Sequence, residues 1–194
     1  MAKRVSVNQV LINALETLLK KTDLDSIKVT DIIEEAGVSR TTFYRHFKDK
    51  YDLINWYYVQ YMRELRAKYL ESQDAYNLTL DLIRYFGEKR EFFLKISGYH
   101  GQNSFLEYFM ESMYKGDVSY LKKRLRVEDL TPQQEYLVRF NSTGMISMVY
   151  DWMAQDCPQS AEELMEMLLM IMSPELKYYF MTSKDVFEAE TFPE

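Results

Sequence analysis

The sequence predicts an all-α protein, and two observations carry this prediction. Apolar residues recur at steps of three and four over most of the 194 residues, which is the spacing of helices with one buried face. No stretch shows the alternation of apolar and polar residues that is typical of a strand, and no repeat or low-complexity linker is present. We therefore expect about nine helices, arranged as a head of three short helices followed by a larger helical body.

The predicted head covers residues 1–50. Its first helix, residues 6–21, carries a stripe of valines, leucines and an alanine, and its second helix spans residues 29–36. Gly37 follows the second helix at the place where a left-handed residue often ends a helix. The third helix, residues 39–46, begins at once after it. Two short helices joined at a glycine are typical of a helix-turn-helix motif.

The third helix has two different faces. Phe43 and Phe47, four residues apart, point inward and anchor a helix that is too short to be stable alone. The opposite face carries guanidinium, hydroxyl and imidazole groups, of the kind that bind base edges and phosphates. These residues are Arg40, Thr41, Thr42, Arg45 and His46. The pattern predicts a recognition helix.

The predicted body covers residues 51–194. Its helices are expected at residues 50–70, 75–87, 90–97, 104–125, 131–155 and 160–172, with a short helix possible beyond residue 173. Residues 97–104, which include His100, have the polar, glycine-containing composition of a loop. Two helix starts carry capping boxes, Thr131 with Gln134 and Ser160 with Glu163.

The helix predicted at residues 160–172 is apolar on nearly every side, which indicates burial on all sides. A second subunit would supply the missing cover, so we expect a dimer in which the last two long helices pair with their symmetry mates as a four-helix bundle. The expected interface residues are Gly144, Met148, Trp152, Leu164, Leu168 and Ile171. The alternative is an ordinary core helix beside a tolerated glycine.

Charge and composition limit the function further. The net charge is -6, yet residues 1–50 hold nine basic and seven acidic residues, so the head is slightly basic and the body acidic. Such a head can still orient on DNA, with modest and salt-sensitive affinity. The one cysteine excludes an internal disulfide, and neither a secretion signal nor a membrane span is predicted. We expect a cytoplasmic protein.

The sequence argues against an enzyme. It has two histidines and one cysteine, and it lacks a nucleophile elbow, a phosphate-binding glycine loop and a His-Glu metal motif. Adjacent acidic pairs such as Glu34 and Glu35 lie on different flanks of a helix and are solvated surface. We predict no catalytic residues, no metal site and no cofactor.

Residues 5–55, and above all DIIEEAGVSRTTFYRHFKDKYDL, resemble the DNA-binding head of the tetracycline-repressor (TetR) family of bacterial regulators. One departure is Lys28, where the family often has a capping threonine, which leaves Ser26 and Thr30 as the alternative candidates to cap the second helix. The segment GMISMVYDWMAQDCPQSAEEL is similar to a subgroup that includes regulators of dihydroxyacetone kinase genes.

The resemblance implies a dimer that places its third helices in successive major grooves of a palindromic operator, about 34–36 Å apart. It implies Arg40, Thr41 and Thr42 as readers of base edges. Contacts to phosphates are implied for Ser39, Tyr44, Arg45, His46, Lys50, Thr30, Lys3 and Arg4. Taken singly, these residues have other interpretations: Ser39 as a helix cap only, Tyr44 as a packing residue, His46 as half-buried structure and Lys50 as solvated charge.

The resemblance also implies a ligand-responsive repressor, in which an effector enters the body and changes the spacing of the two heads. Candidate pocket residues are Tyr57, Tyr61, Phe86, Phe93, Phe105, Phe109 and Tyr150. Aromatic residues at helical spacing are more often core than pocket. The alternative function is a TetR-like co-regulator whose body binds another protein rather than a small molecule.

Overall fold

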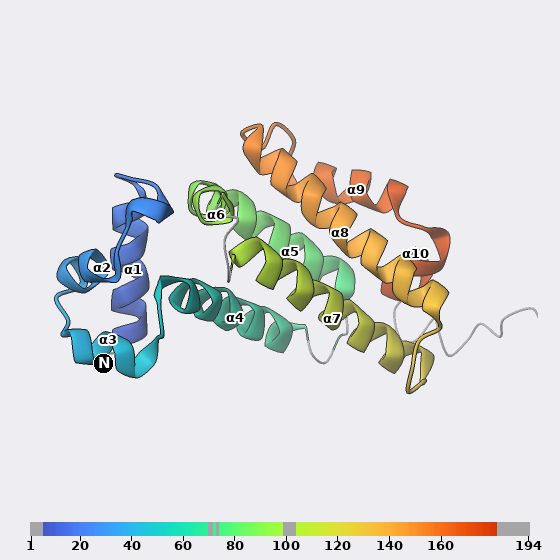
Figure 1. Ribbon diagram of the computed structural model, residues 1–194. Coiled ribbons are helices and arrows are strands. Elements are labelled where there is room, and N and C mark those ends of the chain that lie inside the picture. Colours follow the sequence, from blue (N-terminus) through green and yellow to red (C-terminus); the bar gives the residue numbers. More distant parts are fainter. Residues whose placement is uncertain (1–5, 70–71, 73, 99–103, 182–194) are drawn as a thin grey trace, which may run out of the picture. The chain divides into compact units, whose positions relative to one another are not determined.

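The structure, a computed structural model, describes residues 6–69, 72, 74–98 and 104–181. This part of the chain holds ten α-helices and one short 3-10 helix, and no strand (Figure 1). The prediction of an all-α fold is therefore confirmed. The chain divides into two compact units, Met1–Arg63 with Arg90–Tyr108 and Glu64–Lys89 with Phe109–Glu194. The functional boundary predicted at residue 50 stays a prediction, since packing units and functional domains need not coincide.

The first unit contains the helix-turn-helix. Its helices are α1 (Val7–Leu19), α2 (Val29–Ala36), α3 (Arg40–His46), the first part of α4 (Lys50–Lys68) and α6 (Arg90–Ser97), with the 3-10 helix Leu24–Ser26 between α1 and α2. α1 packs against α2, as Figure 1 shows at the blue end of the chain. The core of this unit is formed by fully buried aliphatic side chains and Phe43: Leu11, Ile12, Leu15, Ile32 and Leu53.

The two ends of α2 are formed differently from each other. Gly37 has φ 64°, so the predicted left-handed end of α2 is confirmed. At the start, neither Ser26 nor Thr30 caps the helix, and that expectation was wrong. Lys28 is the N-cap residue, and its backbone N–H donates to the Asp31 carboxylate at 2.7 Å. The Asp31 carboxylate therefore satisfies the N–H of the N-cap residue itself, whereas a capping threonine would accept a hydrogen bond from an N–H of the first turn.

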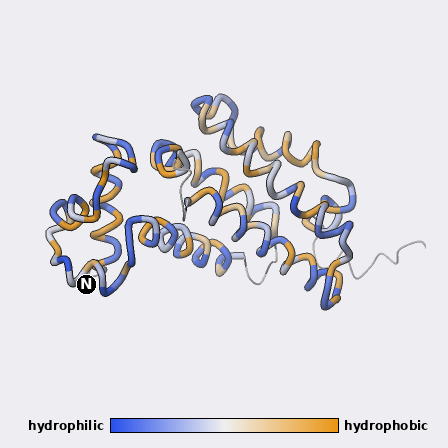
Figure 2. The backbone as a smooth tube through the Cα atoms, in the orientation of Figure 1, coloured by the Kyte–Doolittle hydropathy of each residue, from blue (hydrophilic) through white to orange (hydrophobic). Residues whose placement is uncertain are grey.

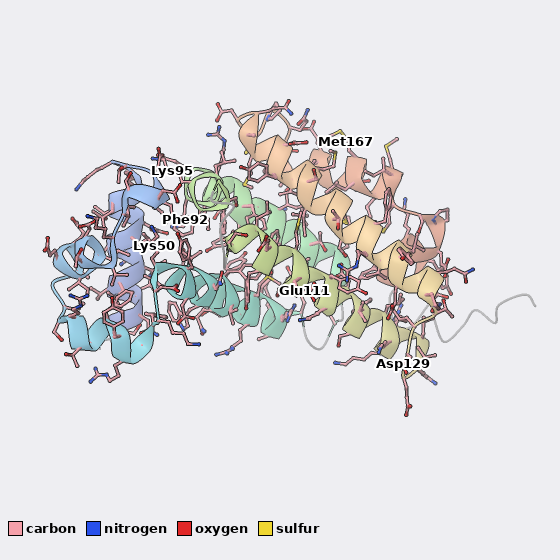
Figure 3. All side chains as sticks on the ribbon, viewed as in Figure 1. Lys50, Phe92, Lys95, Glu111, Asp129 and Met167 are labelled. Atoms are coloured by element: carbon pink, nitrogen blue, oxygen red, sulfur yellow. The ribbon has the colours of Figure 1, made fainter. Side chains whose placement is uncertain are left out.

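Side chains from α4 and α6 bind the C-terminal half of α1. The Lys95 ammonium of α6 donates to the backbone carbonyl of Leu19, at the end of α1 (Figure 3). The Tyr57 hydroxyl of α4 donates to Glu16 at 3.3 Å. The first unit thus joins the three short helices to neighbours that come later in the sequence.

The second unit is built from α5 (Ala75–Glu88), most of α7 (Phe105–Leu125), α8 (Pro132–Ala154), α9 (Ala161–Ile171) and α10 (Pro174–Met181). Both predicted capping boxes, at Thr131 and Ser160, are present. α5 packs against α8, α9 and α10. Trp152 of α8 fills the space beside Gly87 of α5, where an added Cβ would lie 2.8 Å from the indole.

A polar pair lies between α7 and α8. The Ser142 hydroxyl is 2.6 Å from Asp117 Oδ2 and 2.9 Å from the carbonyl of Val138. One hydroxyl has one proton, so it can donate to only one of these acceptors at a time. Both contacts become hydrogen bonds when Asp117 is protonated and donates to Ser142. Burial raises the pKa of Asp117 to about 6, opposed by the hydrogen bond from Ser142 and the charge of Arg66.

Within the described residues, no helix combines the length and apolarity that crossing a membrane requires.

Candidate nucleic-acid interface

Aromatic packing holds α3 in place. Ser39 caps the helix by accepting a hydrogen bond from the Thr42 N–H at 3.1 Å, and Phe47 ends it. Phe43 is fully buried and Phe47 nearly so, with their ring centroids 6.0 Å apart. Phe47 also meets Trp56 of α4 edge to face, at 5.7 Å. The prediction that Phe43 and Phe47 point inward is confirmed, and this packing stabilises a helix of only seven residues.

The opposite side of α3 is open to solvent. Arg40, Thr41, Arg45 and His46 are exposed, and Thr42 is half-buried. Tyr44 is 47% exposed even though its ring lies against Phe43. The residues of α3 proposed from the sequence are therefore accessible to solvent, and they include two guanidinium groups, hydroxyl groups and an imidazole.

Two hydroxyls on this surface are already paired. Ser39 Oγ and Thr42 Oγ1 lie 2.8 Å apart and form a hydrogen bond in which either oxygen can donate. One of the two protons therefore stays available to a DNA group, whichever direction the bond takes. The methyl group of Thr42 is not engaged by this bond and can still contact a thymine methyl.

Arg40 and Tyr44 are in contact along the helix. The Arg40 guanidinium carbon lies 5.7 Å from the centre of the Tyr44 ring, which is within the range of a cation–π interaction. The two residues are four apart, so they occupy neighbouring positions on one helix face.

Lys50 has a structural role that the sequence analysis did not foresee. Its ammonium donates to the carbonyl oxygens of Leu24 at 2.5 Å and Ile27 at 2.8 Å, and so binds the segment between α1 and α2 (Figure 3). An ammonium has three donors, so at most one is left for a phosphate. Partial burial lowers the pKa of Lys50, although the carboxylates of Asp25, Asp31 and Asp49 oppose this shift.

The remaining predicted phosphate contacts lie outside α3. Thr30 is exposed in the first turn of α2. Lys3 and Arg4 lie outside the described residues, as does His100 in the predicted loop.

The predicted pocket residues are divided between the two units. In the first unit, Phe93 and Phe105 are buried with ring centroids 5.7 Å apart, and Tyr57 and Tyr61 are half-buried. In the second unit, Phe86 and Phe109 are buried with centroids 5.2 Å apart, and Tyr150 is half-buried. The four phenylalanines thus form packed aromatic cores, which is the commoner role expected for such residues.

The residues predicted for the dimer interface fall into two groups. Trp152, Leu164 and Leu168 are buried within the chain's own second unit, so they present no surface to a partner. Met148 and Ile171 are exposed, and a Cβ added at Gly144 would meet nothing within 4 Å. Periodicity alone could not separate these groups, because α8 and α9 carry both buried and exposed apolar residues. Figure 2 shows hydrophobic residues recurring along both helices.

Four further exposed apolar residues were missed by the sequence analysis. Tyr136 and Phe140 of α8 are 78% and 79% exposed, and Met167 and Met170 of α9 are 42% and 82% exposed. Together with Met148 and Ile171 they form what we call the α8–α9 apolar face. The spacing of Tyr136, Phe140 and Gly144, four residues apart each time, was the signal that could have revealed it.

The described residues offer no metal site, since no three of their His, Cys, Asp and Glu side chains gather into a group that could hold an ion.

Fold and exposed surface together define the chain as a helix-turn-helix transcriptional regulator. Two family models match it: residues 11–55 match the bacterial regulatory proteins of the tetR family, and residues 73–174 match a transcriptional regulator C-terminal region. The second match alone covers just over half of the chain. The protein belongs to the TetR family, whose members are DNA-binding regulators and not enzymes.

Similar proteins include the HTH-type dhaKLM operon transcriptional activator DhaS of Lactococcus lactis subsp. lactis (strain IL1403), 28% identical over 96 residues. That match spans about half of each protein, 50% of this chain and 51% of the relative. The similarity thus covers only part of this relative, whose name describes an activator.

Solved structures share the fold. A dihydroxyacetone kinase operon activator DhaS aligns with TM-score 0.65 and 20% identity over 88% of this chain and 96% of its own. A TetR transcriptional regulator from Streptococcus agalactiae 2603V aligns with TM-score 0.63 and 20% identity over 86% of this chain and 94% of its own. At this identity the likeness establishes the fold alone.

Proposed function

We propose that the protein is a sequence-specific DNA-binding regulator that binds a palindromic operator as a dimer, with α3 of each subunit in the major groove. The observation that carries this proposal is the solvent face of α3, where cations and hydroxyls stand on a base of buried aromatic rings. A rigid short helix with such a face suits the major groove, which admits a single helix.

Within this proposal the side chains divide by role. Arg40 reads a guanine through two hydrogen bonds, and Thr41 and Thr42 contact neighbouring base edges. Ser39, Tyr44, Arg45, His46 and Thr30 bind phosphates, together with Lys3, Arg4 and the remaining donor of Lys50. Phosphate contacts fix the register of the protein on the duplex, and base contacts supply the sequence preference.

The α8–α9 apolar face supports the dimer. Exposed aromatic and methionine side chains on adjacent helices are costly to leave in water and typical of subunit interfaces. Gly144 lies within this face with open space beside it, which leaves room for the backbone of a partner helix. Two copies joined through α8 and α9 would form a four-helix bundle.

Regulation is proposed from the family resemblance: a small-molecule effector binds the body and favours one spacing of the two heads. The resemblance predicts a repressor. The printed names of the similar DhaS proteins favour activation as a second candidate. A repressor and an activator both act on bacterial DNA, which lies in the cytoplasm, so we propose a cytoplasmic location.

The test is a gel-shift titration with DNA flanking the protein's own gene, repeated across salt concentrations and with a shuffled duplex as control. We expect the genomic duplex to bind more tightly than the shuffled one at every salt concentration. Both affinities should fall as salt rises, because phosphate contacts release counterions. Equal binding of the two duplexes would refute sequence-specific recognition. In vitro transcription from the bound promoter then shows whether added protein lowers or raises the transcript.

A further inference from the structure

We propose that Tyr44 positions the Arg40 guanidinium for base reading, so that the sequence preference depends on an aromatic ring as well as on the cation. This inference rests on the proposed DNA-binding function. It assigns Tyr44 a role beyond the phosphate contact that the family resemblance implies.

The first argument is the contact itself. The Arg40 guanidinium lies 5.7 Å from the Tyr44 ring centre, one helical turn away on α3. A planar guanidinium is attracted to an aromatic face and stacks on it, and this restricts a side chain that is otherwise long and mobile. Reading a guanine requires two parallel hydrogen bonds, so a guanidinium already held in one orientation loses less freedom on binding.

The second argument is that the ring cannot move freely. Tyr44 meets Phe43 edge to face, with centroids 5.4 Å apart and an interplanar angle of 81°. Phe43 is fully buried and contacts Phe47, which in turn contacts Trp56 at 5.7 Å. The ring under Arg40 is thereby fixed to the core of the first unit, while its outer part stays 47% exposed.

The third argument is the lack of a competing partner. Among the described residues, no carboxylate forms an ion pair with Arg40, and its guanidinium lies over the Tyr44 ring. Arg45, next to Tyr44 in the sequence, is also exposed, and no aromatic ring among the described residues lies under its guanidinium. The two arginines of α3 therefore differ in preorganisation, and Arg45 provides a matched control.

The experiment compares Tyr44→Phe, which keeps the ring and removes the hydroxyl, with Tyr44→Leu, which removes both. The wild-type operator is first selected from a random duplex library. The same selection is repeated with Arg40→Ala. The operator position at which this variant no longer prefers guanine is identified as the base read by Arg40. The readout is the ratio of affinities for the operator and for the same duplex with that guanine replaced, measured by fluorescence anisotropy.

We expect Tyr44→Phe to bind both duplexes more weakly and to keep the wild-type ratio. Tyr44→Leu should reduce the ratio by about tenfold, toward that of Arg40→Ala, because a good bidentate contact discriminates on this scale. Adding Tyr44→Leu to Arg40→Ala should change the ratio no further. Arg45→Ala should weaken binding to both duplexes alike.

A wild-type ratio in Tyr44→Leu would overturn the positioning role and leave the DNA-binding proposal standing. If wild-type protein prefers no sequence at all, the proposed function fails and this inference with it. Circular dichroism and thermal melts establish whether each variant keeps the wild-type helix content and stability. Should Tyr44→Leu fail to fold, Tyr44→Trp replaces it, because the larger ring should preserve or increase the ratio and a lowered ratio would contradict the proposal.

Discussion

The molecule has two exposed surfaces of opposite chemistry. The solvent face of α3 offers charged and hydroxyl groups above buried rings, whereas the α8–α9 apolar face leaves the rings and methionines themselves in water. Under the solvent face of α3 the aromatic residues are buried and support the helix. On the α8–α9 apolar face the aromatic residues are themselves exposed. The comparison shows that aromatic content says little about function until the burial of each ring is known.

The largest expected effect comes from removing a buried aromatic ring that supports α3. Phe43→Ala should lower the free energy of unfolding by about 3–5 kcal/mol, because it empties a fully buried site beside Phe47. Chemical denaturation followed by circular dichroism measures this loss. Phe140→Ala is the matched control, since Phe140 is 79% exposed and its removal opens no cavity. The comparison is made at concentrations where the protein is monomeric. If both variants lose the same free energy of unfolding, the two surfaces do not differ as proposed.

A second effect concerns the polar pair between α7 and α8, Asp117 and Ser142. Asp117 has a pKa of about 6 in the folded chain against an ordinary value of 3.8. Between these values the folded chain keeps a proton that the unfolded chain has released, so stability falls as pH rises through the window. Asp117→Asn, which cannot ionise, should be more stable than wild type at pH 7.5, by at most about 3 kcal/mol. Thermal melts at pH 4 should show no such gain; a constant difference at both pH values would contradict the raised pKa.

The α8–α9 apolar face is tested next. Phe140→Glu places a charge in the proposed subunit contact and should weaken dimerisation by at least about tenfold, because exposed aromatic anchors often dominate an interface. Analytical ultracentrifugation across concentration measures the change. Val127→Glu is the control, because Val127 is 42% exposed on another part of the second unit. If the two variants dimerise alike, the apolar face is not the interface.

A further effect concerns Lys50. Lys50→Met keeps most of the side chain's length but loses the bonds to the carbonyls of Leu24 and Ile27, so unfolding should become easier by about 2 kcal/mol. If Lys50 also binds phosphate, the slope of log DNA affinity against log salt concentration should become shallower by about one in Lys50→Met. An unchanged salt slope with lowered stability would assign Lys50 a purely structural role.

Local patterns in the sequence were sufficient for the helices and their ends. Gly37, Ser39, Thr131 and Ser160 act within one helical turn, so their roles follow from neighbouring residues alone. The inward direction of Phe43 likewise follows from helical spacing.

Contacts between distant residues could not be predicted in the same way. Lys50 reaches carbonyls 23 and 26 residues earlier, and no spacing rule indicates such a bond. On α8, Trp152 and Phe140 are both large aromatic residues, and it is the packing of α5 and α9 against α8 that leaves the first buried and the second exposed. The sequence therefore identified the apolar residues of the predicted interface without identifying which of them face outward.

The fit of Trp152 against Gly87 has a consequence for tolerance to mutation. The indole N–H donates to the carbonyl of Gln159, in the turn that leads into α9, so the ring is held at both ends. A single methyl group added on α5 cannot be accommodated by rotating the ring without breaking that bond. Gly87→Ala, which adds one methyl group, would thus displace the Trp152 indole and disturb the turn before α9.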